Sequence, residues 1–178
     1  MKEQFTAEVK LDYAAYRRFA EFQLFKGKSP LIKKAVFYGF GLVAAIFLFL
    51  LGIAERNTSF LMLGGILLLC IALFTYLVKQ VPKKQFRKNK KLLEVVQYYV
   101  FAPDGIIIEL KSGEIDSREE VFYSELYRIY ELKDAFYLYA DKKSAFIIPK
   151  NSLKNVTTEQ AREFFLKKVP DYKYIAVR

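Results

Sequence analysis

AVFYGFGLVAAIFLFLLGIA, residues 35–54, is twenty residues long and contains no charged side chain. FLMLGGILLLCIALFTYLV, residues 60–78, is a second uncharged run of nineteen residues. A helix rises 1.5 Å per residue, so each run would be about 30 Å long, which is the thickness of the hydrocarbon core of a bilayer. A helix also satisfies its own backbone polar groups in lipid. We therefore predict two transmembrane helices at 35–54 and 60–78.

The short connection between these runs sets their arrangement. Only residues 55–59 separate them, so the helices must form an antiparallel hairpin with an external loop. A signal peptide is one alternative for the first run, but that run begins after 34 residues and is followed at once by a second run. The other alternative is a helical hairpin buried in the core of a soluble protein.

Positive charge is concentrated around the apolar runs. Residues 1–91 contain 16 Lys and Arg against 5 Asp and Glu, whereas residues 92–178 contain 13 against 14. The positive-inside rule therefore places both termini in the cytoplasm and predicts a multi-pass protein of the plasma (inner) membrane. The charges before the first run are Lys26, Lys28, Lys33 and Lys34, and those after the second are Lys79, Lys83, Lys84, Arg87, Lys88, Lys90 and Lys91.

The basic segment 79–94 is predicted to be a juxtamembrane linker that contacts anionic lipid headgroups. Each Lys or Arg near an anionic leaflet contributes about 1 kcal/mol of attraction. The predicted contacts are Lys83, Lys84, Arg87 and Lys88. The alternative is that the cluster only sets the topology. Because the excess of positive charge lies in the half with the apolar runs, we expect membrane lipids as partners and no nucleic acid.

The residue types that most catalytic and metal sites require are missing or badly placed. The chain contains no histidine, which excludes Ser-His-Asp, Cys-His and His-zinc sites. The sole cysteine, Cys70, lies in the middle of a predicted span and cannot form an internal disulfide. Residues 39–44 match a dinucleotide-binding pattern, but no strand precedes them. We therefore predict no catalytic, cofactor-binding or metal site, and a protein that is not an enzyme.

Small residues recur within the two runs. Gly41 and Ala45, four residues apart, and Gly64-Gly65 are typical of helices that approach each other closely. We also consider self-association, or contact with another membrane protein, through Gly41 and Ala45.

The region 95–178 predicts a small antiparallel β domain. Six short segments rich in Ile, Val, Tyr and Phe are separated by turn sequences. Thr157 and Gln160 form a capping box that begins an amphipathic helix, which ends near Pro170. The predicted fold class is membrane α+β, with a two-helix transmembrane hairpin and a β-barrel or sandwich of pleckstrin-homology-like shape closed by a C-terminal helix. The predicted strands are 95–101, 106–110, 114–121, 126–132, 135–140 and 145–149.

The cytoplasmic segment 1–34 predicts one strand and one amphipathic helix. Alternating apolar residues indicate a strand over 4–11, and Asp12 can cap a helix that runs to about Phe25. Aromatic residues recur every three positions in this helix, so they form a broad apolar face suited to the membrane interface or to covering the sheet. We expect strand 4–11 to join the C-terminal sheet as a seventh strand. The alternative is an independent amphipathic segment.

The stretch from Val95 to about Leu153 resembles the C-terminal domain of the YcxB-like family. The resemblance implies a small bacterial membrane protein with two spans ahead of a pleckstrin-homology-like domain, and it implies no catalytic residue. The resemblance rests on four short sequence motifs that occur in a fixed order. They are Tyr123-Ser124-Glu125-Leu126, Tyr130-Glu131 before Lys133-Asp134, Phe136-Tyr137-Leu138-Tyr139, and Ala145-Phe146-Ile147-Ile148-Pro149-Lys150.

From these patterns we predict that the protein is a membrane-anchored binding or sensing module on the cytoplasmic face, with an unknown ligand. Beyond the lipid contacts, candidate partner contacts are Lys142 and Lys143 on a hairpin tip, and any exposed members of Phe136, Tyr137 and Tyr139. Alternating aromatics in a central strand usually pack in a core, which is the other interpretation of these three. The alternative functions are a structural subunit of a larger transporter or secretion complex and an enzyme with an unrecognised site.

Overall fold

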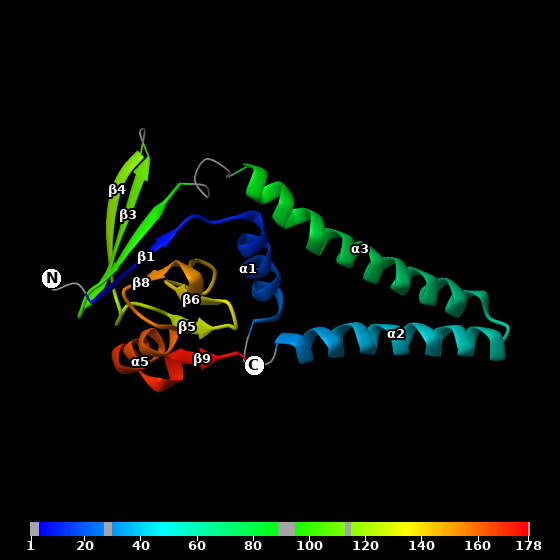
Figure 1. The fold of residues 1–178 in the computed structure, drawn as a ribbon. Helices are drawn as coiled ribbons and strands as arrows, with labels where there is room; N and C mark the ends of the chain where they lie inside the picture. Colours follow the sequence, from blue (N-terminus) through cyan, green and yellow to red (C-terminus); the bar gives the residue numbers. More distant parts are fainter. Residues whose placement is uncertain (1–3, 27–29, 89–94, 113–114, 178) are drawn as a thin grey trace.

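Two long helices extend from a β-rich unit as an antiparallel hairpin (Figure 1). The computed structural model describes residues 4–26, 30–88, 95–112 and 115–177. The hairpin helices are α2 (Pro30–Ala54) and α3 (Thr58–Lys88), and both are long and apolar enough to span a membrane. Only 11% and 6% of their most apolar windows are buried. The hairpin is therefore not the core of the β-rich unit, which argues against the soluble alternative.

Both helices continue beyond the predicted spans. Helix α2 begins at Pro30, which suits the first turn of a helix because proline lacks only an N–H that would be unpaired there. Helix α3 extends to Lys88, so the segment predicted as a linker is helical at least that far. Its Lys, Gln and Arg residues favour helix. Lys90 and Lys91 lie outside the described residues.

The strands of the β-rich unit form two sheets. The first has the order β4-β3-β2-β1-β8 and the second β7-β6-β5-β9. Adjacent strands are antiparallel except β5 and β9, which are parallel. The strands are β1 (Phe5–Val9), β2 (Gln97–Phe101), β3 (Gly105–Ser112), β4 (Ile115–Phe122), β5 (Arg128–Glu131), β6 (Ala135–Tyr139), β7 (Ala145–Pro149), β8 (Leu153–Lys154) and β9 (Tyr174–Ala176).

The N-terminal strand lies inside the first sheet. Strand β1 pairs with β2, with Phe5 opposite Phe101 and Val9 opposite Gln97, and its other edge pairs with β8. Phe5, Ala7 and Val9 are buried, as their alternation predicts. The expectation that this strand joins the C-terminal sheet is confirmed. The chain on the two sides of the hairpin therefore forms one unit, into which the hairpin is inserted.

The six predicted strands of region 95–178 are all present, but their arrangement differs from a single meander. The chain leaves the first sheet after β4 and begins the second sheet at β5. Strands β8 and β9 have only two and three residues, so they are too short to show an alternation of apolar and polar residues in the sequence. The described pairings give two separate sheets and do not show a closed barrel.

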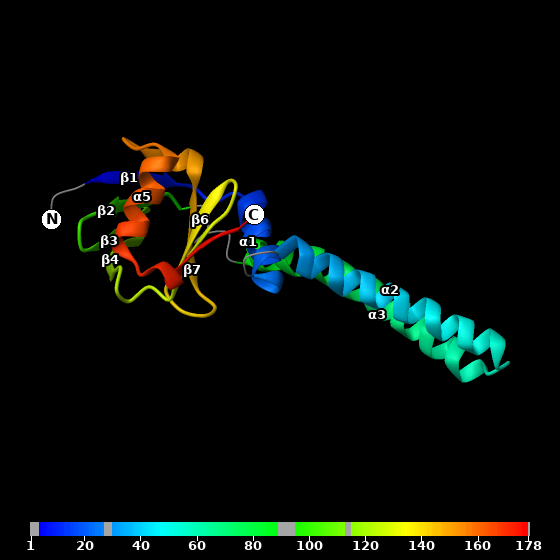
Figure 2. The ribbon, with the colours of Figure 1, turned by 90° about the horizontal axis from the view of Figure 1, so that it is seen from below.

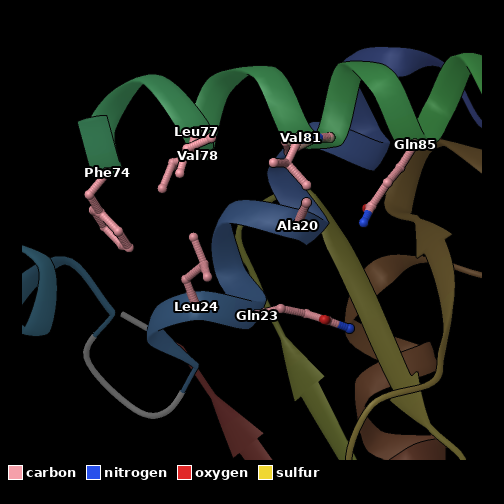
Figure 3. A pocket seen from close by; sticks show the side chains of 9 residues that line it. Ala20, Gln23, Leu24, Phe74, Leu77, Val78, Val81 and Gln85 are labelled. Atoms are coloured by element: carbon pink, nitrogen blue, oxygen red, sulfur yellow. The ribbon is translucent and has the colours of Figure 1, made fainter. Parts of the chain in front are cut away.

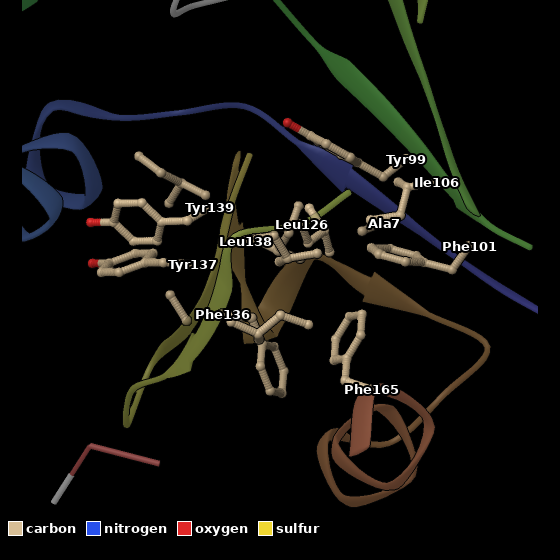
Figure 4. Packing of buried hydrophobic residues seen from close by; sticks show 14 of the residues in the cluster. Ala7, Tyr99, Phe101, Ile106, Leu126, Phe136, Tyr137, Leu138, Tyr139 and Phe165 are labelled. Atoms are coloured by element: carbon tan, nitrogen blue, oxygen red, sulfur yellow. The ribbon is translucent and has the colours of Figure 1, made fainter. Parts of the chain in front are cut away.

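The C-terminal helix packs against both sheets. Helix α5 (Thr158–Lys168) begins at the predicted capping box, in which both the Thr157 and the Gln160 side chains make their hydrogen bonds. Phe165 is fully buried, and its ring lies 5.5 Å from that of Phe101 and 5.3 Å from that of Phe136 (Figure 4). One side chain thus joins strands of the two sheets. Two short 3₁₀ helices, Lys150–Ser152 and Asp171–Lys173, complete the unit.

Helix α1 (Tyr13–Phe25) covers the other face of the second sheet. Its first turn is capped as predicted, because Asp12 accepts a 2.7 Å hydrogen bond from the Ala15 backbone N–H. The rings of Phe19 and Phe22 lie 5.2 and 5.3 Å from that of Tyr137 on β6. The second sheet is therefore covered by α1 on one side, and on the other by the first sheet together with α5 (Figure 4).

Replacement of Phe165 by alanine should destabilise the β-rich unit. Removing a fully buried phenylalanine leaves a cavity and costs about 3–5 kcal/mol. The neighbouring Leu166 is 40% exposed, so Leu166→Ala is a matched control expected to cost about 1 kcal/mol or less. Unfolding of the full chain in mild detergent measures both. Equal destabilisation by the two variants would contradict the placement of Phe165 in the core.

Candidate functional site

Helix α1 holds the C-terminal end of α3 in place. Phe86 of α3 is buried, and its ring centroid lies 5.6 Å from those of both Tyr13 and Tyr16 on α1. The Tyr16 hydroxyl donates a 3.2 Å hydrogen bond to Oε1 of Gln85. Since α3 is one continuous helix, the position of its last turns relative to α1 also sets the direction of the hairpin relative to the sheets.

The basic residues of α3 cover one flank of the helix, from beside this contact round to the opposite side. At 100° per residue, Pro82 and Phe86 share the side that faces α1, and both are buried. The positively charged residues are all exposed, and they cover an arc from about 20° to 200° around the helix from Phe86, with Lys79 and Lys83 beside the buried side and Lys84 and Lys88 opposite it. We call this set the basic face. It comprises Lys79, Lys83, Lys84, Arg87 and Lys88. The structure therefore brings together the four predicted lipid contacts and adds Lys79.

A groove of about 380 Å³ lies between α1 and α3 (Figure 3). One end is apolar, with Phe74 of α3 near Leu24 of α1, and the other end carries the carboxamides of Gln85 and Gln23. The sequence does not indicate this groove, because its two walls are 50 to 65 residues apart in the chain and meet only through the packing of α1 on α3. Its lining residues are Ala20, Gln23, Leu24, Phe74, Leu77, Val78, Val81, Pro82 and Gln85.

A second, more polar pocket of about 570 Å³ lies near the start of α2. Three cationic side chains line it, Lys26, Lys33 and Arg128, but each is engaged within the protein. The Lys33 Nζ donates a 3.0 Å hydrogen bond to the Lys26 carbonyl. The Arg128 guanidinium lies 5.2 Å from the ring centroid of Tyr127. Because these internal contacts already use the cations, the pocket is a weaker anion site than the basic face.

The predicted contacts Lys142 and Lys143 lie on the exposed loop between β6 and β7. Helix α1 binds the backbone of this loop, because Gln23 Nε2 donates a 2.7 Å hydrogen bond to the Lys143 carbonyl and Lys26 Nζ donates to the Lys142 carbonyl. The Asp141 carboxylate accepts backbone hydrogen bonds from Lys143 and Ser144, which lower its pKa. Both lysine side chains are exposed on a loop whose backbone is well anchored.

The aromatic residues named as partner contacts are in the core instead. Phe136, Tyr137 and Tyr139 are all 1% exposed or less. Strand β6 has both faces covered, since Phe136 points toward α5 and Tyr137 toward α1 (Figure 4). Burial also raises the pKa of Tyr137 and Tyr139 above the ordinary value. None of the three is available to a partner of the folded protein, which corrects the prediction of partner contacts.

Gly41 and Ala45 pack inside the hairpin. A Cβ atom on Gly41 would lie 2.8 Å from Cδ1 of Ile71 on α3, and Ala45 is 1% exposed. Gly64 is likewise covered by the ring of Phe49. The prediction that small residues let the two helices approach closely is confirmed at these three positions. Contact of Gly41 and Ala45 with a second copy or another membrane protein stays a prediction, although α3 packs on this surface within the hairpin.

Metal and thiol chemistry find little support in the described part of the chain. It contains no group of three or more His, Cys, Asp or Glu side chains placed to hold a metal ion. Cys70 is exposed on α3, within the apolar window of the hairpin.

Comparison with known proteins assigns part of the chain to a family. Residues 101–168, from the end of β2 to the end of α5, match the family model described as YcxB-like protein. The chain carries a YcxB-like domain. Searches of curated proteins and of solved structures gave no match. The matched stretch begins after β1, α1 and the hairpin, although β1 completes the first sheet of the domain and α1 covers the second.

A buried ionic cluster, which the sequence does not indicate, is centred on Glu131 of β5 in the YcxB-like domain. Glu131 is 4% exposed and accepts hydrogen bonds from the Arg162 guanidinium at 2.7 and 2.6 Å. Lys150 Nζ donates to it at 2.8 Å and the Tyr174 hydroxyl at 2.6 Å. The Glu131 carboxylate thereby joins its own strand β5 to α5, to the 3₁₀ helix Lys150–Ser152 and to β9. Its partners lie 19 to 43 residues away, so no local pattern in the sequence indicates the cluster.

The cluster keeps Glu131 ionised. Burial by itself would raise its pKa, but the hydrogen bonds from Arg162, Lys150 and Tyr174 outweigh burial and lower the pKa from 4.5 to about 2. A lowered pKa in the folded state means that the carboxylate stabilises the fold above pH 4.5. This stabilisation is lost as the pH falls from 4.5 toward 2. The arrangement is that of a structural clamp rather than an acid or base poised near neutral pH.

Replacement of Glu131 by glutamine should reduce the stability of the domain at pH 7 by about 2–3 kcal/mol and flatten its acid dependence below pH 4.5. The reason is that glutamine keeps the shape but removes the charge that pairs with Arg162 and Lys150. Thermal unfolding in detergent between pH 7 and pH 3 measures both effects. Glu163→Gln, on the exposed side of α5, is the control and should leave the profile unchanged. A wild-type profile retained by Glu131→Gln would contradict this role.

Proposed function

We propose that the protein is a membrane-anchored, non-enzymatic binding module whose basic face contacts anionic lipid headgroups at the cytoplasmic surface. The observation that carries this proposal is the continuity of α3, which passes from an apolar window to five exposed cations without leaving the helix. Because α1 fixes the end of α3, headgroup contact would hold the sheets in one orientation above the bilayer. Such a module can then bind or sense a further ligand close to the membrane.

The depth of each cation along α3 sharpens the proposal. Val78 ends the apolar run, and Lys83 and Lys84 follow it by about 8–9 Å along the axis. The headgroup region extends about 5–8 Å beyond the hydrocarbon core on each side, so these side chains reach it. Arg87 and Lys88 lie about 14–15 Å beyond Val78. They act through a field that decays over about 8–10 Å at physiological salt.

The pairing of β1 with β2 supports one membrane topology. Residues before and after the hairpin share one sheet, so both must lie on the same side of a membrane that the hairpin crosses. The positive-inside rule makes that side the cytoplasm, because the loop between α2 and α3 carries only Arg56. We accordingly propose a multi-pass protein of the bacterial plasma membrane with both termini inside. The two sheets with α5 packed against them support a pleckstrin-homology-like shape for the domain.

The full chain is the correct species for experiments. Strand β1 occupies a central position in the first sheet, and α1 covers the second sheet. A fragment that begins after the hairpin would lack both and would expose Tyr137 and Phe101. Tests of lipid contact therefore require the intact protein in proteoliposomes.

Neutralising the basic face should weaken its preference for anionic lipid according to depth. We expect Lys83→Gln with Lys84→Gln to lose up to about 1 kcal/mol per residue, and Arg87→Gln with Lys88→Gln to lose less. Energy transfer from a labelled protein to labelled phosphatidylglycerol in proteoliposomes measures the preference. The control is Lys154→Gln with Lys167→Gln, exposed lysines of β8 and α5 on the side away from the hairpin (Figures 1 and 2). Equal effects of all three pairs would contradict a specific contact.

Cysteine labelling tests the topology. In a Cys70→Ser background, Glu55→Cys in the loop of the hairpin should react with a membrane-impermeant maleimide added to intact cells. Lys167→Cys on α5 should react only after the cells are lysed, because the β-rich unit lies inside. The reverse pattern, or labelling of both positions in intact cells, would contradict the proposed orientation.

A further inference from the structure

We propose that the groove between α1 and α3 binds one anionic phospholipid of the cytoplasmic leaflet, with an acyl chain along its apolar end and the phosphate beside Lys84 and Lys88. This inference rests on the proposed function, since it requires the groove to lie at the membrane surface. It goes further by distinguishing a seated lipid from a diffuse attraction of headgroups to the basic face.

The position of the groove favours a lipid over a soluble ligand. Phe74, Leu77 and Val78 belong to the apolar run that ends α3's predicted span, and they also line the groove. Leu77 and Leu24 are 44% and 52% exposed. The apolar end of the groove is therefore continuous with the surface that the hairpin presents to acyl chains. A chain that enters from the bilayer crosses no polar barrier.

The groove also changes from apolar to polar in the direction that a phospholipid requires. Its apolar end is toward the hairpin, and its carboxamide end, with Gln23 and Gln85, is toward the sheets (Figure 3). A lipid of the cytoplasmic leaflet has the same polarity, because its tail points into the membrane and its headgroup toward the cytosol. Soluble amphiphiles have no such fixed orientation relative to α3.

Cations flank the polar end of the groove. Leu77, Val81, Lys84 and Lys88 are spaced i, i+4, i+7 and i+11, so they form one stripe along α3. The stripe is apolar where it borders the groove and basic in the next turns, and both lysines are exposed. From α1, Gln23 is hydrogen-bonded to the Lys143 carbonyl, which places the Lys142-Lys143 tip at the same end. This charge selects an anionic headgroup.

Photocrosslinking in detergent-free proteoliposomes tests the proposal. The probe is phosphatidylglycerol with a photoactivatable acyl chain, and mass spectrometry locates the crosslinks. We expect labelling around Leu24 and Leu77 to exceed that at the lipid-facing Leu69. Ala20→Trp fills the groove from α1 and should reduce the excess about tenfold, because it displaces the apolar contacts of the chain. Ala14→Trp, on the exposed side of the same helix, is the matched control and should retain the labelling.

Several outcomes would overturn the seated lipid. Labelling around Leu24 no higher than at Leu69, an excess that Ala20→Trp leaves unchanged, or crosslinks to a second copy of the chain each contradict it. Val81→Trp, which narrows the groove from α3, replaces Ala20→Trp if that variant unfolds. The proposed function, contact of the basic face with headgroups, is tested independently of the groove. If the groove labelling fails while Lys83→Gln with Lys84→Gln still lowers the anionic-lipid preference, headgroup contact stands and only the seated lipid falls.

Discussion

The packing of α1 between α3 and the second sheet determines how the rest of the molecule is arranged. Its aromatic residues are three positions apart, so successive rings rotate by about 60° around the helix. Tyr13 and Tyr16 therefore contact Phe86 of α3, whereas Phe19 and Phe22 contact β6. One short helix thus joins the hairpin to the sheets. Without it, the basic face would have no defined direction relative to the domain.

This arrangement links the fold to the proposed membrane role. A flexible linker after α3 would only raise the local concentration of a tethered domain. A helix that continues to Lys88 and docks on α1 instead transmits the orientation of the hairpin to the sheets. The same docking creates the groove, because two convex helices that cross leave space where their side chains diverge. Basic face, groove and orientation therefore have a single structural origin.

Local patterns in the sequence predicted much of the fold. The two apolar runs, the six alternating strands and the caps at Asp12 and Thr157 depend on neighbours within a few residues, and all are present. Of the two interpretations of Phe136, Tyr137 and Tyr139, core packing is confirmed and exposure to a partner is wrong. Exposure of a strand residue depends on what covers each face, and here α1 and the first sheet cover both. The run AFYLY has no polar side of its own, which is consistent with two covered faces, but it does not say which elements cover them.

By itself, the sequence determined that two apolar helices lie between an N-terminal segment and a β-rich region with one C-terminal helix, because hydrophobic period and capping are local properties. Only the tertiary structure decided that β1 lies between β2 and β8, that Glu131 is clamped by three distant partners, and that a groove separates α1 from α3. Each of these features joins residues far apart in the chain. Such contacts are selected by the packing of whole elements, which no local pattern records.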